Sequence, residues 1–164
     1  MDSKRAKLFD RLEELGIAST TVEHAPVFTV DESQDLRGTI PGAHTKNLFL
    51  KDKDGRLALV VAKEDTKVDL KALSKRLGFG RFSFGKPELM ASVLGVEPGS
   101  VTAFAVVNET SSQLTAVVVD QALMDFAEVN CHPLVNSATT RVATGDLLRF
   151  MRACGHDPLI LPLG

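Results

Sequence analysis

Three short segments of the sequence carry groups that could act on a substrate. Lys46 and Asn47 lie at the start of a predicted strand, where a lysine is either a surface charge or a cation that holds an anionic group. The turn Gly99-Ser100-Val101-Thr102 offers backbone N–H groups and hydroxyls to a carbonyl or carboxylate oxygen. The loop from His132 to Asn136 adds two side chains that can hydrogen-bond. Each segment alone also fits a structural role, but together they suit the positioning of a substrate that supplies much of its own reactivity.

Nucleophilic and metal chemistry are less well supported. Cys131 and His132 are neighbours on a predicted strand, so their side chains face opposite ways and cannot form a nucleophile–base pair. We expect Cys131 to be a small buried hydrophobe, and Cys154, in the last turn of a predicted helix, to be the same. The four histidines are far apart and lack partners at metal-ligand spacing, so we expect no metal and no cofactor.

Composition fits one soluble domain spanning residues 1–164. The chain is 44% hydrophobic and 24% charged, has no apolar run long enough to span a bilayer, and shows no signal-peptide core, so we expect a cytoplasmic protein. The net charge is −2, yet residues 46–86 contain eleven basic and five acidic side chains. This basic stretch is either a surface for phosphate groups or a solvated lysine-rich face.

The elements that position these residues follow from hydrophobic periodicity and turn signals. Alternation places Lys46, Leu48 and Leu50 on one strand face and Asn47 and Phe49 on the other. We predict strands over 17–23, 127–131 and 139–143, and hairpins over 46–62 and 101–119. We predict helices over 4–15, 70–77, 87–94 and 121–125, and a last helix that Thr144 caps and Gly155 ends. This order predicts a mixed α/β (α+β) domain whose single sheet is mainly antiparallel or barrel-like, with helices packed outside it.

Five stretches resemble the YbaK/prolyl-tRNA synthetase editing-domain superfamily, and among its branches the free-standing ProXp-ala (PrdX) type. They cover residues 24–29, 41–50, 68–70, 94–102 and 132–137, in order along nearly the whole chain. The resemblance implies a hydrolase that deacylates mischarged alanyl-tRNA(Pro) in trans, without a metal. The branch that acts on Cys-tRNA(Pro) carries a Gly-x-x-x-Pro loop, whereas the matching loop here, residues 99–103, lacks that proline, which favours the alanine-specific branch.

The resemblance also assigns roles to residues. It implies catalytic roles for Lys46, Gly99, Ser100, Val101 and His132, and substrate contacts by Asn47, Thr102 and Asn136. Candidates for the amino-acid pocket are Val27, Phe28, Val30, Phe49 and Leu134. Lys67, Lys71 and Lys75 lie four residues apart, so they would share an outer face and could guide the acceptor stem.

The implied partner is the acceptor end of tRNA(Pro), with prolyl-tRNA synthetase or an elongation factor as a further candidate, and we expect a monomer that uses neither membrane nor DNA. Three other interpretations stay open. The chain could deacylate Cys-tRNA(Pro) or another small misacylated amino acid such as serine, it could be a catalytically silent tRNA- or synthetase-binding module, or it could be a small-molecule-binding regulator.

Overall fold

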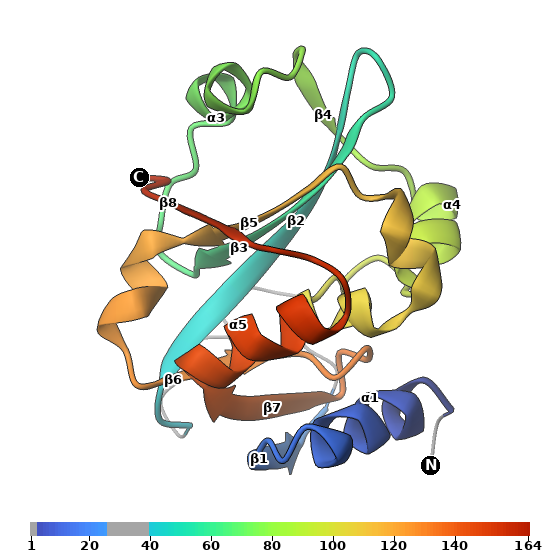
Figure 1. Cartoon of the computed structure of the whole chain (residues 1–164), viewed down its shortest axis with the longest axis vertical. Helices are drawn as coiled ribbons and strands as arrows, with labels where there is room; N and C mark the ends of the chain where they lie inside the picture. The colour runs from blue at the N-terminus through green and yellow to red at the C-terminus, as the bar shows by residue number, and fades with distance from the viewer. Residues whose placement is uncertain (1–2, 26–39) are drawn as a thin grey trace.

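A single eight-stranded sheet organises the protein. The computed structural model describes residues 3–25 and 40–164 (Figure 1). The sheet runs in the order β1-β7-β6-β2-β3-β5-β8, and β4 also pairs with β2. The strands are β1 (Ser19–Glu23), β2 (Ala43–Asp52), β3 (Leu57–Lys63), β4 (Phe82–Phe84), β5 (Ala116–Asp120), β6 (Glu128–Cys131), β7 (Ala138–Ala143) and β8 (Leu159–Leu161). The predicted mixed sheet with helices outside it is confirmed, and within the described residues it is open rather than closed into a barrel.

The central hairpin forms as the sequence predicts. β2 and β3 pair antiparallel from Thr45 with Lys63 to Lys51 with Leu57. Gly55 adopts φ +87° at the tip, a conformation that glycine adopts without steric cost. The predicted alternation along β2 is also confirmed, because Phe49 packs in one apolar cluster while Leu48 and Leu50 pack in a second cluster on the opposite face.

One edge of β2 is shared by two strands that leave a gap between them. β3 occupies the other edge. On the shared edge, β6 pairs in parallel with Ala43 and His44, and β4 pairs antiparallel with residues 50–52. Along residues 45–49 this edge of β2 therefore faces no strand among the described residues. Figure 1 shows β2 crossing the molecule from β6 to the hairpin tip beside β4.

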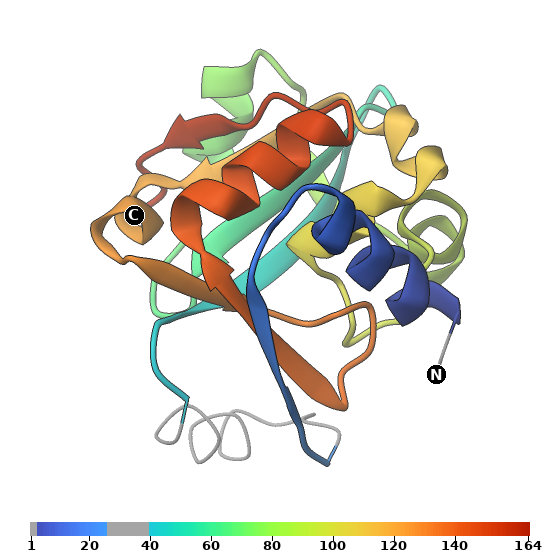
Figure 2. The same cartoon turned by 60° about the horizontal axis from the view of Figure 1, so that its bottom comes forward.

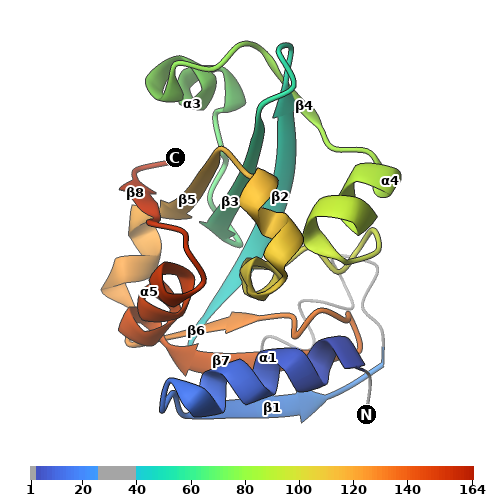
Figure 3. The same ribbon diagram turned by 45° about the vertical axis from the view of Figure 1, so that its right-hand side comes forward.

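Helices cover the two faces of the sheet. The larger apolar cluster joins β2 and β3 to α1 (Ser3–Glu14), α5 (Thr144–Ala153) and the 3₁₀ turn at Ala103–Val107. Figure 2 shows α1 and α5 in front of the strands. The smaller cluster lies under α3 (Leu70–Leu77), and Figure 3 shows α3 near the hairpin tip, at the opposite end of the molecule from α1.

Local signals fix the bounds of these helices. Asp69 caps α3 by accepting a hydrogen bond from the Ala72 N–H at 3.0 Å, and Gly78 ends the helix at φ +72°. α4 (Pro87–Leu89) continues as a π-helical turn over Met90–Leu94 until Gly95. A 3₁₀ turn at Gln121–Asp125 matches the predicted helical turn. Within the described ranges, no helix is long and apolar enough to cross a membrane.

The prediction of a second hairpin, over residues 101–119, is wrong. Ala103–Val107 and Glu109–Gln113 are 3₁₀ turns, and β5 instead pairs in parallel with β3. Residues 103–107 are all buried, and a short continuous apolar run does not distinguish a strand from a buried helical turn.

The short strands β4 and β8 were not predicted. Thr144 is the first residue of α5 rather than its cap, since its hydroxyl donates to the Phe126 carbonyl at 2.6 Å.

Candidate functional site

Lys46 lies on β2 opposite Ala62 of β3, beside the gap in the sheet edge. Its side chain is half-buried on the face of Leu48 and Leu50. The pKa of Asp65 is lowered chiefly by its hydrogen bond from Lys63, and the charge of Lys46 lowers it further. Within the described part of the chain, the Lys46 ammonium forms no ion pair or hydrogen bond, so it is free to bind an anion.

On the opposite face of β2, the side chain of Asn47 has a polar atom without a hydrogen-bond partner among the described residues. Its Nδ2 donates to the Thr45 hydroxyl at 3.4 Å, and that hydroxyl in turn donates to the Asn130 carbonyl at 2.8 Å. The Asn47 Oδ1 atom is buried and has no hydrogen-bond partner among residues 3–25 and 40–164. A buried carbonyl oxygen without a donor costs free energy, so it is a candidate acceptor for a substrate N–H or O–H.

The turn at residues 99–102 is built so that two of its amides stay available. Gly99 adopts φ +90°, which favours glycine. The Ser100 N–H donates to the Glu97 carbonyl at 3.0 Å and is therefore occupied. In the part of the chain that the structure describes, the Gly99 and Val101 amides make no such bond. An oxyanion role at this turn thus falls to Gly99 and Val101 rather than to all three predicted residues.

Thr102 fastens this turn to the loop that carries His132. The Thr102 side chain is fully buried. Its hydroxyl donates to the His132 carbonyl at 2.7 Å and accepts the Phe104 N–H at 3.2 Å. A Cβ atom at Gly99 would lie 3.7 Å from Asn136 Nδ2. The structure therefore brings together two of the three segments that the sequence singled out.

His132 has one ring nitrogen committed and one available. Its Nδ1 lies 3.3 Å from the Ala138 carbonyl, which can only accept, so Nδ1 carries the proton. The neutral ring then offers Nε2 as an acceptor. Burial lowers the pKa of His132; the hydrogen bond to Ala138 raises it, and the charge of His24 lowers it further. The imidazole is thus held in the form that can accept a proton.

Two features of this site escaped the sequence interpretation. His24 received no role, yet its Nε2 lies 2.9 Å from the Thr139 hydroxyl and its charge acts on His132. Leu134 is the one non-glycine residue at positive φ in the described ranges, at φ +68°. That conformation costs a leucine about 1–2 kcal/mol, and such strain concentrates at functional loops. No sequence signal marks Leu134 as strained, whereas His24 lies within one of the five stretches that resemble the family.

The predicted amino-acid pocket is described only in part. Val27, Phe28 and Val30 lie outside the described residues. Phe49 is 2% exposed and belongs to the core; a Cβ atom at Gly85 would come within 2.3 Å of its ring. Leu134 is also 2% exposed. Phe49 and Leu134 therefore belong to the apolar core and offer almost no surface to a ligand.

The predicted tRNA-guiding lysines lie elsewhere, at α3. Lys71 and Lys75 are on the helix, Lys67 precedes it, and all three are exposed. Lys71 and Lys75 line a groove of about 620 Å³ together with Phe79 and Arg81. The structure thus places the expected basic surface at the hairpin-tip end of the molecule, separate from the turn and loop around Thr102.

The expectation of a buried cysteine is confirmed for Cys131 and is wrong for Cys154, which is only partly buried. Cys131 is 3% exposed, and burial raises its pKa to about 11. Burial also raises the pKa of Cys154, against smaller opposing effects from Arg11. Among residues 3–25 and 40–164, no group of three or more His, Cys, Asp or Glu side chains could hold a metal ion.

Known proteins share both the sequence and the fold. The family model for the aminoacyl-tRNA editing domain matches residues 24–150, so the chain belongs to the aminoacyl-tRNA editing domain family. It is 39% identical over 159 residues to the Danio rerio protein named Prolyl-tRNA synthetase associated domain-containing protein 1, covering 96% of this chain and 86% of that protein. It is 36% identical to the Prolyl-tRNA editing protein ProX of Acetoanaerobium sticklandii, covering 95% of this chain and 94% of that protein.

A solved structure supports the fold alone. A crystal structure described as a candidate trans-editing enzyme for prolyl tRNA synthetase superposes with a TM-score of 0.75 at 20% identity, over 100% of this chain and 99% of the other. The family model and the two relatives confirm, at the level of the family, the resemblance drawn from the five stretches.

Proposed function

We propose that the protein is a trans-editing deacylase that hydrolyses Ala-tRNA(Pro) to alanine and tRNA(Pro). Membership of the editing-domain family and the relative named for prolyl-tRNA editing support the reaction class. One structural observation carries the proposal. The Thr102 hydrogen bond to the His132 carbonyl holds a turn against a loop, and among the described residues the Gly99 and Val101 amides and the His132 Nε2 atom have no partner. Hydrolysis of an activated ester needs these two groups close together.

The reaction follows from these groups. A water molecule adds to the ester carbonyl, and the Gly99 and Val101 amides stabilise the oxyanion that develops on the carbonyl oxygen. His132 Nε2 accepts a hydrogen bond from that water or from the neighbouring ribose hydroxyl. The bond between the carbonyl carbon and the ribose oxygen then breaks, and the ribose oxygen takes up the proton that the water loses. Because the aminoacyl ester is already activated, no protein nucleophile is required.

Lys46 and Asn47 hold the 3′ end of the RNA in this proposal. Their side chains leave β2 on opposite faces, so a ligand that meets both must lie across the edge of the strand. The gap between β6 and β4 leaves that edge without a described strand neighbour. The Lys46 ammonium binds a phosphate or ribose oxygen, and Asn47 Oδ1 accepts from the aminoacyl ammonium or a hydroxyl.

The preference for alanine rests on size and on one loop. A synthetase pocket shaped for proline rejects the smaller alanine by only about 1–3 kcal/mol, so a second and smaller pocket is needed to remove the error. Such a pocket accepts alanine and excludes proline. The loop at residues 99–103 lacks the proline of the Cys-tRNA(Pro) branch, which supports alanine as the substrate.

The decisive experiment measures hydrolysis of tRNA(Pro) charged with alanine, cysteine, serine or proline, by the wild type and by Lys46→Ala. We expect turnover of Ala-tRNA(Pro) and none of Pro-tRNA(Pro). Loss of a charge-assisted contact at Lys46 lowers kcat/KM by about 10- to 100-fold. Lys7→Ala, on the exposed face of α1, is the matched control and keeps wild-type activity. Undiminished activity in Lys46→Ala would refute its role.

The same panel separates the other interpretations. If the cysteine or serine ester is hydrolysed faster than the alanine ester, that amino acid is the preferred substrate instead of alanine. Binding of tRNA without turnover of any ester would identify a silent binding module. A complete absence of salt-dependent tRNA binding would favour a small-molecule-binding regulator.

The names of the animal relatives also mention prolyl-tRNA synthetase. We propose a cytoplasmic association with that enzyme, to be tested by co-sedimentation of the two purified proteins.

A further inference from the structure

A second groove lies at the tip of the β2–β3 hairpin, outside the site described above. Its volume is about 510 Å³, and its lining includes Lys51, Lys53, Phe84, Lys86, Glu88 and Ser92. It is bounded by the hairpin tip, by β4 and by the helix that continues from α4 into the π-helical turn. None of the residues assigned to the reaction lines it, so its role has to be inferred separately.

Phe84 is the most exposed large hydrophobic side chain of the described residues, at 63%. It lies at the end of β4 opposite Leu50 of β2. Its neighbour in alternation, Phe82, instead packs edge-on against Phe79 with ring centroids 5.7 Å apart. One exposed hydrophobic residue alone is ordinary on a protein surface. An exposed aromatic ring inside a charged groove, however, is a typical contact for a planar ligand.

The charge around this ring is strongly positive. Lys51, Lys53 and Lys86 form no ion pair with a described residue, and Glu88 is the acidic residue that faces them with an unengaged carboxylate. The Lys53 stem packs against Gly80, since a Cβ atom at Gly80 would lie 2.6 Å from its Cγ. Three ammonium groups against one carboxylate favour an anionic ligand.

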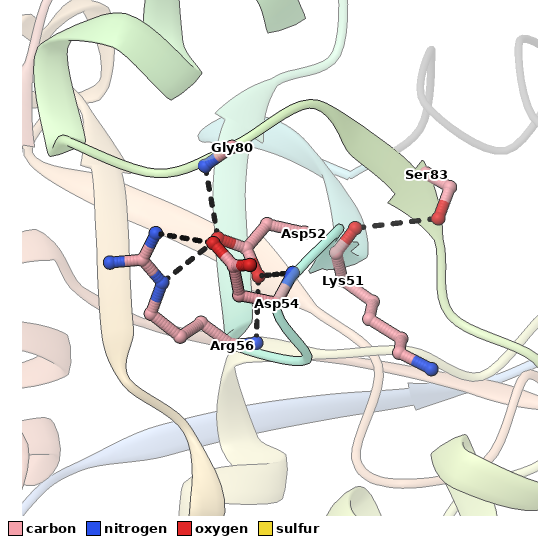
Figure 4. A network of polar contacts seen from close by, with 6 residues as sticks. All are labelled: Lys51, Asp52, Asp54, Arg56, Gly80 and Ser83. Atoms are coloured by element: carbon pink, nitrogen blue, oxygen red, sulfur yellow. Dashed lines mark hydrogen bonds and ion pairs between the residues drawn. The ribbon is translucent and has the colours of Figure 1, made fainter.

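Asp52 lines the same groove but does not cancel this charge. Its carboxylate accepts from the Asp54 N–H at 2.9 Å, the Arg56 N–H at 2.8 Å, the Arg56 Nε at 2.9 Å and the Gly80 N–H at 3.0 Å. Figure 4 shows these contacts converging on Asp52 while the Lys51 side chain points away from them. The Asp52 charge is thus paired with Arg56, and the groove keeps its positive character.

We propose that this groove binds an unpaired nucleotide of the RNA substrate, with its base stacked on Phe84 and its phosphates held by Lys51, Lys53 and Lys86. Aromatic rings within basic grooves bind single-stranded nucleic acid in this way. Lys51 lies five residues along β2 from Lys46, which is about 17 Å at about 3.4 Å per residue. The bound nucleotide is therefore not the one that carries the amino acid. This inference rests on the proposed function, since it takes tRNA as the partner.

The test measures binding of two fluorescent probes by anisotropy: uncharged tRNA(Pro) and a single-stranded RNA of eight nucleotides. Phe84→Ala and Phe84→Leu are both expected to weaken binding by about tenfold, within the range of base–aromatic stacking. Replacing both Lys51 and Lys86 by Gln makes the salt dependence of oligonucleotide binding shallower, by about 0.7 in slope for each phosphate that the variant no longer neutralises. Lys7→Gln on α1 is the matched control and retains wild-type affinity.

Each outcome decides between explanations. Wild-type affinity in Phe84→Ala overturns the proposal. If Phe84→Leu keeps wild-type affinity while Phe84→Ala loses it, the contact is apolar, of the kind a protein partner makes, rather than base stacking. That result also overturns the proposal. If Lys7→Gln loses as much RNA affinity as the groove variants, binding reflects general charge attraction. That result overturns the proposal as well. RNA binding that depends on Phe84 without any ester hydrolysis would refute the deacylase function while supporting this groove. At saturating charged tRNA, the Phe84 variants keep wild-type kcat.

Discussion

Replacing Thr102 by valine tests whether one buried hydroxyl organises the site. The substitution keeps the side-chain shape and removes the donor to the His132 carbonyl and the acceptor of the Phe104 N–H. The buried Phe104 N–H and the partly buried His132 carbonyl then lose their partner, at a cost of up to about 1–3 kcal/mol each, and the valine avoids the cost of burying a hydroxyl. We expect a net loss of about 2–3 kcal/mol in the free energy of unfolding. In a domain of this size that lowers Tm by about 5–10 °C.

The same substitution separates stability from catalysis. Without the Thr102 bond, the turn of Gly99 and Val101 is no longer fixed relative to His132, and small misplacements of reacting groups cost up to about 100-fold in rate. At a temperature where the variant is fully folded, we expect kcat for the aminoacyl ester to fall by at least about tenfold while tRNA affinity stays unchanged. Circular dichroism melting and single-turnover deacylation measure the two effects.

Thr102→Ser is the matched control, because it keeps the hydroxyl and removes one buried methyl group, at a cost of about 1 kcal/mol. The serine variant should retain kcat. If the valine and serine variants melt within about 1 °C of each other and turn over equally fast, the hydrogen bond has no organising role and the reasoning fails.

Two further predictions concern pH. Burial raises the pKa of Asp52, but its hydrogen bonds to Gly80, Arg56 and Asp54 outweigh this and lower the pKa from 3.8 to about 2. Its contribution to stability is therefore complete above pH 3.8 and is lost as pH falls through about 2. Asp52→Asn should lower Tm at neutral pH and less so near pH 2, whereas the control Asp54→Asn should change little; parallel melting curves at all pH values would contradict this. Because burial lowers the pKa of His132, kcat/KM should be level at neutral pH and decline only below pH 6.5, and a decline that begins above pH 7 would exclude His132 as the acceptor.

The sequence predicts the elements whose signals are local. The hairpin of β2 and β3 and the capped helix α3 need only an alternating pattern, a turn residue and a cap, and both form as predicted. The prediction of a strand over 101–107 fails because a run of apolar residues fits either structure, and residues 103–107 are buried as a 3₁₀ turn in the cluster that includes α1 and α5. The parallel pairing of β3 with β5 depends on contacts about 58 residues apart, which no local pattern specifies.

In the candidate site, too, the sequence indicates individual residues but not the long-range contacts between them. Residue type and resemblance predict Lys46, the turn and His132 as site residues, but not the contacts that connect them. The bond that joins Thr102 to His132 spans 30 residues, and the positive φ of Leu134 is imposed by the surrounding fold rather than by its own preference. The engagement of the Ser100 N–H by the Glu97 carbonyl is visible only in the turn geometry.

The gap along β2 has a mechanical consequence. β2 is the one described strand common to two half-sheets, and the half with β6, β7 and β1 is joined to it through two residue pairs, Ala43 with Val129 and His44 with Asn130. Rocking one half against the other would strain these two rungs, the Thr45 hydrogen bond to the Asn130 carbonyl, and the apolar packing of Val129 and Val142 with Phe49. His132 follows β6 while Lys46 belongs to the hairpin, so such rocking changes the span between them. The separation of these two groups therefore depends on the two rungs and on the apolar cluster that the two halves share.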